Sequence, residues 1–460
     1  MRRVLLALVR WLAEALVRLY YPARAVEGAE RIPAGRPVVF VVNHPNGLLD
    51  PLVLRVATGR PARFLAKSTL FGNPFGRLAM DAFGSLPVYR VRDAGARAND
   101  VTRNDETFAR CRAALARGEA LALFPEGTSH SDPQLKPLKT GAARIALSAE
   151  REFADATTGE ARLRAVIVPV GLFYERKARF RSRVLLVVGE PVETASLLPR
   201  YLADERATVD ALTDEIRARI GAVVLQAETN DLLVGIARVA RWTADKKPAD
   251  DVASEEALAA DVRRARELVE AYERLRARDP ARVDAVVAEA RAYTRTLRHL
   301  GVRDPWALEL EPIAPRRLLV AVGKALVAAP IALVGAILGW GPYRLAGIVA
   351  ERVTKEEDVL GTVKLIAGAT FLFVAWAAEA AVAAAITDRA SVGVAVFLIG
   401  VSAGYVALWF DELVVDTALA VRTLWLRAFH FDMARQLGER RRALADSVSR
   451  ALEEASTDAS

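Results

Sequence analysis

The chain has 460 residues, of which 53% are hydrophobic and 26% are charged, and it carries a formal net charge of +8. A single cysteine excludes an internal disulfide framework, and the excess of Lys and Arg favours anionic partners such as acidic lipid headgroups. Nucleic acid is the other anionic class, but no zinc-finger spacing, RNA-binding signature or aromatic-interleaved basic stretch supports it. High apolar content beside high charge predicts separate soluble and membrane parts, in a chain long enough for two or three domains.

Residues 1–25 carry an amphipathic pattern that differs from a signal peptide. Arg10, Glu14 and Arg18 recur every four residues and interrupt the apolar core that a signal peptide needs. The apolar residues of the opposite face are Leu5, Leu6, Val9, Trp11, Leu12, Leu16 and Leu19. This pattern predicts a helix that lies at a membrane surface, with an ordinary helix packed on the next domain as the alternative.

The first chemical motif follows an apolar, β-branched run, Val38–Val42, which reads as a buried strand. His44, one of only four histidines, comes directly after it in a turn rich in Pro, Asn and Gly, and Asp50 follows six positions later. A carboxylate on one imidazole nitrogen would fix the ring and leave the other nitrogen as a base. The alternative is structural, because Asp50 before Pro51 also has the pattern of a helix N-cap.

Three further blocks follow in order. They are Gly84-Ser85-Leu86-Pro87-Val88-Tyr89-Arg90, Phe124-Pro125-Glu126-Gly127-Thr128-Ser129-His130 and Val166-Ile167-Val168-Pro169-Val170-Gly171-Leu172. With the His44–Asp50 block they resemble the glycerolipid acyltransferase family, the enzymes that acylate glycerol-3-phosphate and lysophosphatidic acid. Phe64-Leu65-Ala66-Lys67 and Leu138-Lys139-Thr140-Gly141-Ala142 are similar to that family too. The resemblance covers residues 30–195 and implies an α/β domain over 26–225, with a central mixed sheet flanked by helices.

One spacing departs from the common form of the family. Five residues, Pro45 to Leu49, separate His44 from Asp50, one more than usual. The fungal-type glycerol-3-phosphate and dihydroxyacetone-phosphate acyltransferases are similar to the longer form. Neither spacing puts both side chains on one helix face, so the pair has to meet across a turn.

The resemblance implies acyl transfer from a thioester, acyl-CoA or acyl carrier protein, to an alcohol. His44 would take the hydroxyl proton and Asp50 would orient the ring, so no serine or cysteine nucleophile and no metal or redox cofactor is required. Cys111 lies outside the four blocks in a predicted helix, residues 107–116. Backbone N–H groups of the Asn46-Gly47 turn are candidate donors to the oxyanion.

A glycerol phosphate acceptor requires cationic partners. Arg90 is the main candidate, since a guanidinium binds phosphate with two hydrogen bonds, and Lys67 and Lys139 would add positive charge. Exposed N–H groups at Gly127-Thr128 would contribute to the same anion site. The resemblance also assigns Gly84 to substrate binding and Glu126 to the acceptor, where Glu126 would hold a glycerol hydroxyl or position a basic residue. His130 is interpreted as a loop histidine.

Residues 226–310 change to an Ala-, Arg- and Glu-rich helical composition, and 253–278 and 281–300 read as a helical hairpin of open role. Residues 311–412 form the membrane region. There 365–386 and 392–410 are predicted to span a hydrocarbon core of about 30 Å, and 318–340 to be interfacial or re-entrant. The basic tail, 413–460, holds Arg422, Arg427, Arg435, Arg440, Arg441 and Arg442. It is predicted to be cytoplasmic, as is the catalytic half, because acyl-CoA is cytosolic.

The extended C-terminal half and the stretch Glu356–Lys364 are similar to the larger, membrane-anchored fungal-type branch. Two other functional classes, a hydrolase and a non-catalytic scaffold, stand against acyl transfer to glycerol phosphate. A lipid ester hydrolase would use the same His–Asp pair on water, but no Gly-x-Ser-x-Gly elbow follows a predicted strand; the one match to that pattern, Gly400 to Gly404, lies inside the predicted span 392–410. A non-catalytic lipid-binding scaffold would not need the His44, Asp50, Arg90 and Glu126 set, and a metal site built on His44, Asp50, Glu126 and His130 lacks ligand spacing. A lysophospholipid acyltransferase or transacylase with another acceptor stays open, as do acyl-chain preference and oligomeric state.

Overall fold

The computed structural model describes residues 1–89, 99–243, 255–300 and 315–456. By their contacts these residues form two compact units. The first holds residues 1–230 with 251–260 and 356–362, and the second holds 231–250, 261–355 and 363–460. Each unit is therefore discontinuous in the sequence.

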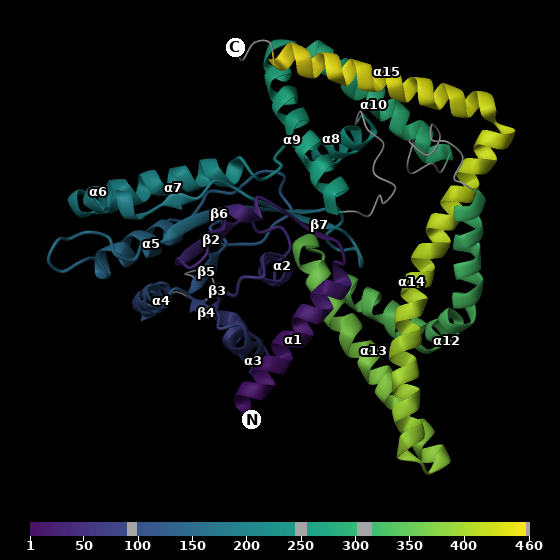
Figure 1. Cartoon of the computed structure of the whole chain (residues 1–460), viewed down its shortest axis with the longest axis horizontal. Helices are drawn as coiled ribbons and strands as arrows, with labels where there is room; N and C mark the ends of the chain where they lie inside the picture. Colours follow the sequence, from purple (N-terminus) through teal and green to yellow (C-terminus); the bar gives the residue numbers. More distant parts are fainter. Residues whose placement is uncertain (90–98, 244–254, 301–314, 457–460) are drawn as a thin grey trace. The chain divides into compact units, whose positions relative to one another are not determined.

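The first unit is built on a mixed sheet with helices on its faces (Figure 1). Its strands are β1 (Arg24–Glu27), β2 (Val38–Val42), β3 (Ala62–Lys67), β4 (Leu86–Val88), β5 (Ala120–Leu123), β6 (Val166–Tyr174), β7 (Val184–Val188) and β8 (Val192–Glu193). Its main helices are α1 (Arg2–Tyr20), α2 (Leu49–Thr58), α3 (Pro74–Ala82), α4 (Asn99–Ala116), α5 (Gly141–Glu152), α6 (Leu198–Ala203) and α7 (Glu205–Gly221). The predicted α/β class with a central mixed sheet is confirmed.

The sheet order is β1-β7-β6-β2-β5-β3-β4, with β8 paired to β6. Strands β2 to β6 run parallel to one another through the pairs β2–β5, β2–β6, β3–β5 and β3–β4, whereas β7 and β8 run antiparallel to β6. Strand β2 is buried at every position, as expected for a central parallel strand with both faces covered. The parallel direction brings the carboxyl ends of β2 to β6 to one edge of the sheet.

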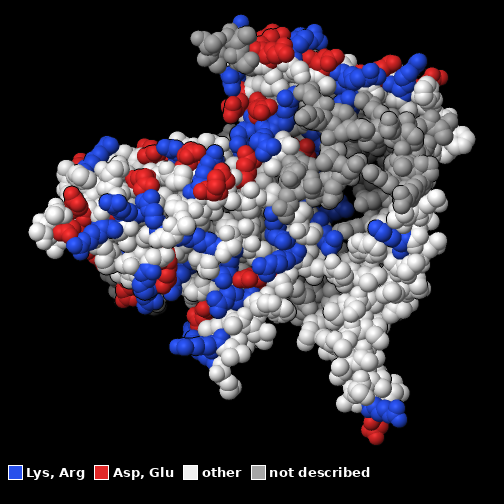
Figure 2. All heavy atoms as spheres, in the orientation of Figure 1, with Lys and Arg blue, Asp and Glu red and all other residues white. Residues whose placement is uncertain are grey.

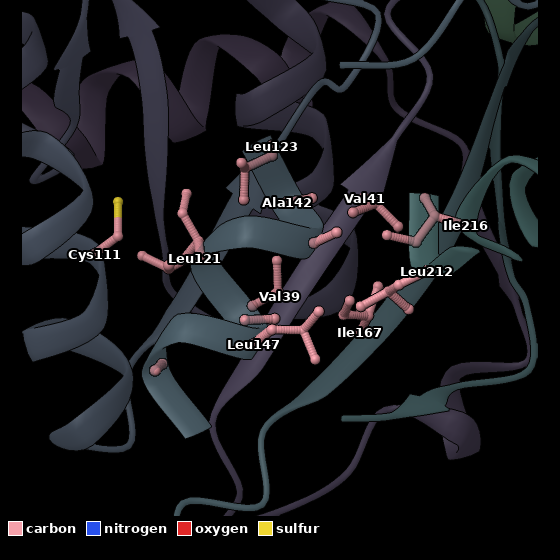
Figure 3. Packing of buried hydrophobic residues seen from close by; sticks show 14 of the residues in the cluster. Val39, Val41, Cys111, Leu121, Leu123, Ala142, Leu147, Ile167, Leu212 and Ile216 are labelled. Carbon is pink, nitrogen blue, oxygen red and sulfur yellow. The ribbon is translucent and has the colours of Figure 1, made fainter. Parts of the chain in front are cut away.

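The core lies between one face of the sheet and helices α4 to α7 (Figure 3). Alternate residues of β2 and β5, among them Val39, Val41 and Leu121, point to this face, where they meet Ile145 and Leu147 of α5. Cys111 of α4 belongs to the same cluster and is fully buried. Burial raises the pKa of its thiol to about 12, so this cysteine is an inert core residue.

Helix α1 packs against α2 and α3 through part of its surface only. Glu14, from the charged face of the amphipathic pattern, forms an ion pair with Arg55 of α2 at 2.7 Å, and Val17 is buried. The apolar residues nearer the N-terminus stay exposed: Val4, Leu5, Leu8, Trp11 and Leu12. Helix α1 therefore both packs on the sheet domain and keeps an exposed apolar face. The role of this face at a membrane surface stays a prediction.

The second unit is helical. It contains α8 (Asn230–Trp242), most of α9 (Glu255–Arg278), α10 (Pro280–Leu300), α12 (Pro315–Val353), most of α13 (Glu357–Thr387), α14 (Ala390–Phe429) and α15 (Phe431–Ser456). Segments 253–278 and 281–300 of the expected hairpin are largely helical, as α9 and α10. Helix α10 packs mainly against α15, and the Tyr293 hydroxyl of α10 donates a hydrogen bond to the Leu437 carbonyl of α15 at 3.3 Å.

Among the described residues of this region, three helices are long and apolar enough to cross a membrane: Leu319–Val353, Glu357–Thr387 and Ala390–Val415. Segment 318–340, expected to be interfacial or re-entrant, is part of the continuous helix α12, which has Pro330 and Pro342 in its interior. In Figure 2 the visible parts of α13 and α14 are mostly uncharged, and charged atoms reappear where the chain turns between them. These findings concern length and composition, so the number of crossings stays a prediction.

Small residues let these apolar helices approach closely. A Cβ added at Gly335 of α12 would lie 2.0 Å from the Ala403 carbonyl oxygen of α14. The indole of Trp376 in α13 lies against Gly400 and Gly404 of α14. Spacing of small residues by four positions is typical of helix packing in membranes.

We expect Leu147→Ala to lower the free energy of unfolding of the sheet domain by about 2–5 kcal/mol, because it removes a fully buried side chain and leaves a cavity. The matched control is Leu202→Ala in α6, where the side chain is 59% exposed; its effect should stay within about 0.5 kcal/mol. Thermal unfolding of the detergent-solubilised chain measures the difference. Equal midpoints for the two variants would contradict the described core.

Candidate active site

The polar and charged residues of the candidate site gather at the edge of the sheet where the parallel strands end. His44 comes two residues after β2, Glu126 three residues after β5, Lys67 ends β3 and Tyr174 ends β6. Ligands and catalytic groups of open α/β sheets collect outside the carboxyl ends of the strands. The strand order of the sheet therefore brings together residues that are far apart in the sequence.

His44 and Asp50 meet across the turn despite their long spacing. The ring Nδ1 of His44 lies 2.8 Å from Asp50 Oδ2, and the Asp50 carboxylate is fully buried while the His44 side chain keeps 16% exposure. Gly47, with φ of +48°, makes the turn that folds Asp50 back on His44. Asp50 lies in the first turn of α2, whose N-cap is Leu48, so the N-cap alternative for Asp50 is wrong.

The Asp50 carboxylate accepts hydrogen bonds from two further donors. The backbone N–H of Asn46 donates to Oδ2 at 2.8 Å, and the Tyr174 hydroxyl donates to Oδ1 at 2.7 Å. Both oxygens are thus bonded, which compensates the cost of burying the charge. Burial and the nearby Asp50 charge raise the pKa of Tyr174 well above its usual value, so its hydroxyl stays protonated and donating.

The His44 ring is held from its face as well as from Nδ1. It stacks on Phe124, with ring centroids 4.0 Å apart and planes 18° from parallel. A neutral ring that donates Nδ1–H to Asp50 keeps its lone pair on Nε2. That nitrogen is positioned to act as a general base.

Glu126 ties the loop after β5 to the loop that carries His44. Its side chain is 1% exposed; Oε1 accepts the His44 backbone N–H at 3.1 Å and Oε2 accepts the Lys136 backbone N–H at 2.9 Å. Oε2 also pairs with Nε2 of His130, whose backbone N–H donates to the His44 carbonyl. Of the two roles expected for Glu126, this geometry matches positioning of a basic residue.

The two predicted phosphate-binding lysines, Lys67 and Lys139, lie at the edge of the site and are exposed. Neither Lys67 nor Lys139 forms an ion pair with another described residue. Lys139 donates its backbone N–H to the Pro125 carbonyl at 2.7 Å, and its stem passes Gly127, which has φ of +74°. Both lysines are free to meet an anion.

Other expected residues are placed differently. Arg90 lies outside the described residues. Gly84 precedes β4, at the amino end of the strands, so the structure does not bring it to the edge where His44 lies; it makes a turn with φ of +61°. The Asn46 N–H, one of the two expected oxyanion donors, is instead bonded to Asp50.

Within the described part of the chain no group of three or more His, Cys, Asp and Glu residues could hold a metal ion.

Three residues of the site were not identified from the sequence: Asn46 as a donor to Asp50, Phe124 under the His44 ring and Tyr174. Tyr174 closes the strand that contains the apolar-Pro block, and its place at a strand end is the one sequence signal that could have drawn attention to it. Phe124 is the first residue of the Phe-Pro-Glu-Gly block, where its aromatic type is visible but its partner is not.

Comparison with known proteins matches both halves of the chain. Residues 23–172 match the Acyltransferase family model, and residues 253–458 match the model described as Glycerol-3-phosphate acyltransferase 2 C-terminal domain. An uncharacterized acyltransferase of Schizosaccharomyces pombe is 24% identical over 64% of this chain and 54% of its own length. Glycerol-3-phosphate O-acyltransferase 2 of Saccharomyces cerevisiae is 29% identical over 57% of this chain and 36% of its own length.

The chain thus spans about half the length of the first relative and about a third of the second. Among solved structures, the 1-acyl-sn-glycerophosphate acyltransferase of Thermotoga maritima is 20% identical with a TM-score of 0.33, over 48% of this chain and 80% of that chain. The two family models match in order and together cover most of the sequence: the chain is an acyltransferase, and its C-terminal half is similar to the glycerol-3-phosphate acyltransferase 2 C-terminal domain.

Proposed function

We propose that this protein transfers a fatty acyl group from acyl-CoA or acyl carrier protein to a hydroxyl of glycerol-3-phosphate or 1-acyl-glycerol-3-phosphate, at a membrane, in phospholipid biosynthesis. The observation that carries the proposal is the 2.8 Å contact between His44 Nδ1 and the buried Asp50, which leaves Nε2 as a base. The names of the relatives, glycerol-3-phosphate and 1-acyl-sn-glycerol-3-phosphate acyltransferases, support the acceptor class.

In the proposed reaction Nε2 of His44 removes the proton of the acceptor hydroxyl as its oxygen attacks the thioester carbonyl. The tetrahedral intermediate collapses, the carbon–sulfur bond breaks, and the leaving thiolate takes the proton from the His44 imidazolium. Asp50 stabilises that imidazolium through the Nδ1 hydrogen bond. No covalent enzyme intermediate is needed, in agreement with the burial of the one cysteine.

Lys67 and Lys139 would attract the acceptor phosphate, and we assign Arg90 to the same role from its block. Gly127 has φ of +74°, a backbone conformation that glycine adopts without strain, and the Lys139 stem lies in ordinary contact with it. Glu126 would act on this site by holding the loop rather than by direct contact, since its oxygens are bonded to the protein.

We place the catalytic half and the C-terminal tail on the cytoplasmic side, which requires an even number of crossings. Because three helices have the length and composition of a span, one of them would not cross. We assign this role to α12, which contains two interior prolines, Pro330 and Pro342.

His44→Ala should abolish acyl transfer, by a factor of about a thousand or more, since it removes the base and leaves the fold. The matched control, His299→Ala, replaces an exposed histidine of α10 and should retain full activity. Membranes that contain the chain are assayed with labelled acyl-CoA or acyl carrier protein and with glycerol-3-phosphate, lysophosphatidate, another lysolipid or no acceptor. Fatty acid release without any esterified acceptor would support an ester hydrolase, and activity in His44→Ala would refute the mechanism.

Tyr174→Phe should lower kcat about tenfold with little change in KM, because Asp50 Oδ1 loses its donor and the carboxylate holds His44 less firmly. In the unmodified chain the raised pKa of Tyr174 means that activity should not fall as pH rises through about 10, the usual tyrosine range. Steady-state kinetics from about pH 6 to about pH 11 measure both. Tyr343→Phe, at a residue that is 49% exposed, is the control; unchanged kcat in Tyr174→Phe would show that this bond is not used.

The membrane topology is testable because Cys111 is buried and its thiol has a raised pKa, so the native chain gives little background labelling. Ala390→Cys lies at the first residue of α14, just after the turn that follows α13, and Glu439→Cys lies on α15. In right-side-out vesicles a membrane-impermeant maleimide should label the first variant from outside and the second only after permeabilisation. Labelling of both from the same side would overturn the proposed topology.

A further inference from the structure

The first residues of α13 belong to the unit that contains the active site. Residues 356–362 are grouped by their contacts with residues 1–230, although α13 continues to Thr387 as one of the apolar helices. Asp358 and Thr362 are each 6% exposed. This short segment is therefore packed against the sheet domain and is part of its structure.

The segment touches the turn that carries His44 through two glycines. A Cβ added at Gly361 would lie 3.0 Å from Asn46 Oδ1, 3.0 Å from the Lys177 carbonyl oxygen and 3.3 Å from a methyl of Leu49. On the other side, a Cβ at Gly47 would lie 2.9 Å from the Asp358 carbonyl oxygen. Neither position has room for a side chain without displacement of its neighbours.

Asn46 connects this contact to the catalytic pair. It is fully buried, and its Nδ2 donates to the Tyr21 hydroxyl at 2.7 Å and to the Lys177 carbonyl at 3.3 Å. Its backbone N–H donates to Asp50, which in turn holds His44. A shift of Asn46 would therefore change the position of the carboxylate that orients the base.

An ion pair fixes the same helix start to the loop after β6. The Lys177 ammonium lies 3.5 Å from Glu357 and donates to the Ser131 hydroxyl, so the loop after β5 is joined to the arrangement. The Tyr21 hydroxyl donates to the Lys177 carbonyl at 2.5 Å. Three segments distant in the sequence thus converge on Asn46.

We propose that Gly361 is a positioning residue for acyl transfer: the lack of a side chain there lets the start of α13 close on Asn46, and Asn46 holds Asp50 and His44 in their reactive geometry. Gly361 acts through Asn46 and does not touch the substrate. The inference rests on the proposed acyl transfer for its kinetic test, and its structural test is independent of any activity.

The test compares Gly361→Ala with Gly368→Ala in the full-length chain. Both substitutions replace glycine by alanine inside α13 and gain the same helix propensity, but no described residue lies within 4 Å of a Cβ at Gly368. We expect Gly361→Ala to lower kcat about tenfold, with KM for the acceptor changed less than about twofold, because the catalytic geometry shifts while the binding residues stay. Gly368→Ala should match the unmodified chain.

Hydrogen–deuterium exchange of peptides that cover residues 43–50 gives the second readout. Gly361→Ala should speed exchange of the Asn46 amide, which is bonded to Asp50, without lowering the thermal unfolding midpoint relative to Gly368→Ala. Unchanged exchange and unchanged kcat would overturn the inference. A lower midpoint with faster exchange throughout the chain would overturn it as well, since the glycine would then serve stability alone. Faster local exchange in a chain that transfers no acyl group would support the positioning role and refute the proposed function.

Discussion

The burial of the Asp50 charge is the constraint on which the active site depends. A carboxylate without solvent is stable only when its oxygens are bonded, and Asp50 obtains its bonds from His44, Asn46 and Tyr174. These donors come from the end of β2, from the following turn and from the end of β6. The need to satisfy one buried charge thus fixes the His44 ring, the turn and the neighbouring strand relative to one another.

The loop after β5 adds a second fixed point. Buried Glu126 bonds the backbone N–H of His44, and Phe124 packs on the ring. The histidine is therefore held by its backbone, by one ring nitrogen and by one ring face, which leaves a single nitrogen for chemistry. Pre-organisation of this kind reduces the reorganisation that the reaction itself requires.

The sequence predicted the parts of this arrangement that local patterns determine. Val38–Val42 is a buried strand because a continuous β-branched run suits a parallel strand with both faces covered. The His44–Asp50 pair was identified from residue type and position. Asn46, Tyr174 and Gly361 were not, because each acts through a contact between segments that are distant along the chain. Gly84 was assigned from its block, whereas the direction of β4 places it at the other end of the strands.

Helix α13 shows that a boundary drawn at the end of the sheet would divide this protein incorrectly. A fragment of residues 1–230 would keep the eight described strands and the His44–Asp50 pair, yet it would lack the seven residues, 356–362, that cover the Asn46 turn. Leu49 and Asn46, now buried, would gain solvent there. Attempts to obtain a soluble enzyme by trimming the apolar helices would therefore need to restore this segment, for example by fusing it to the shortened chain, because the catalytic domain is completed by residues that also begin an apolar helix.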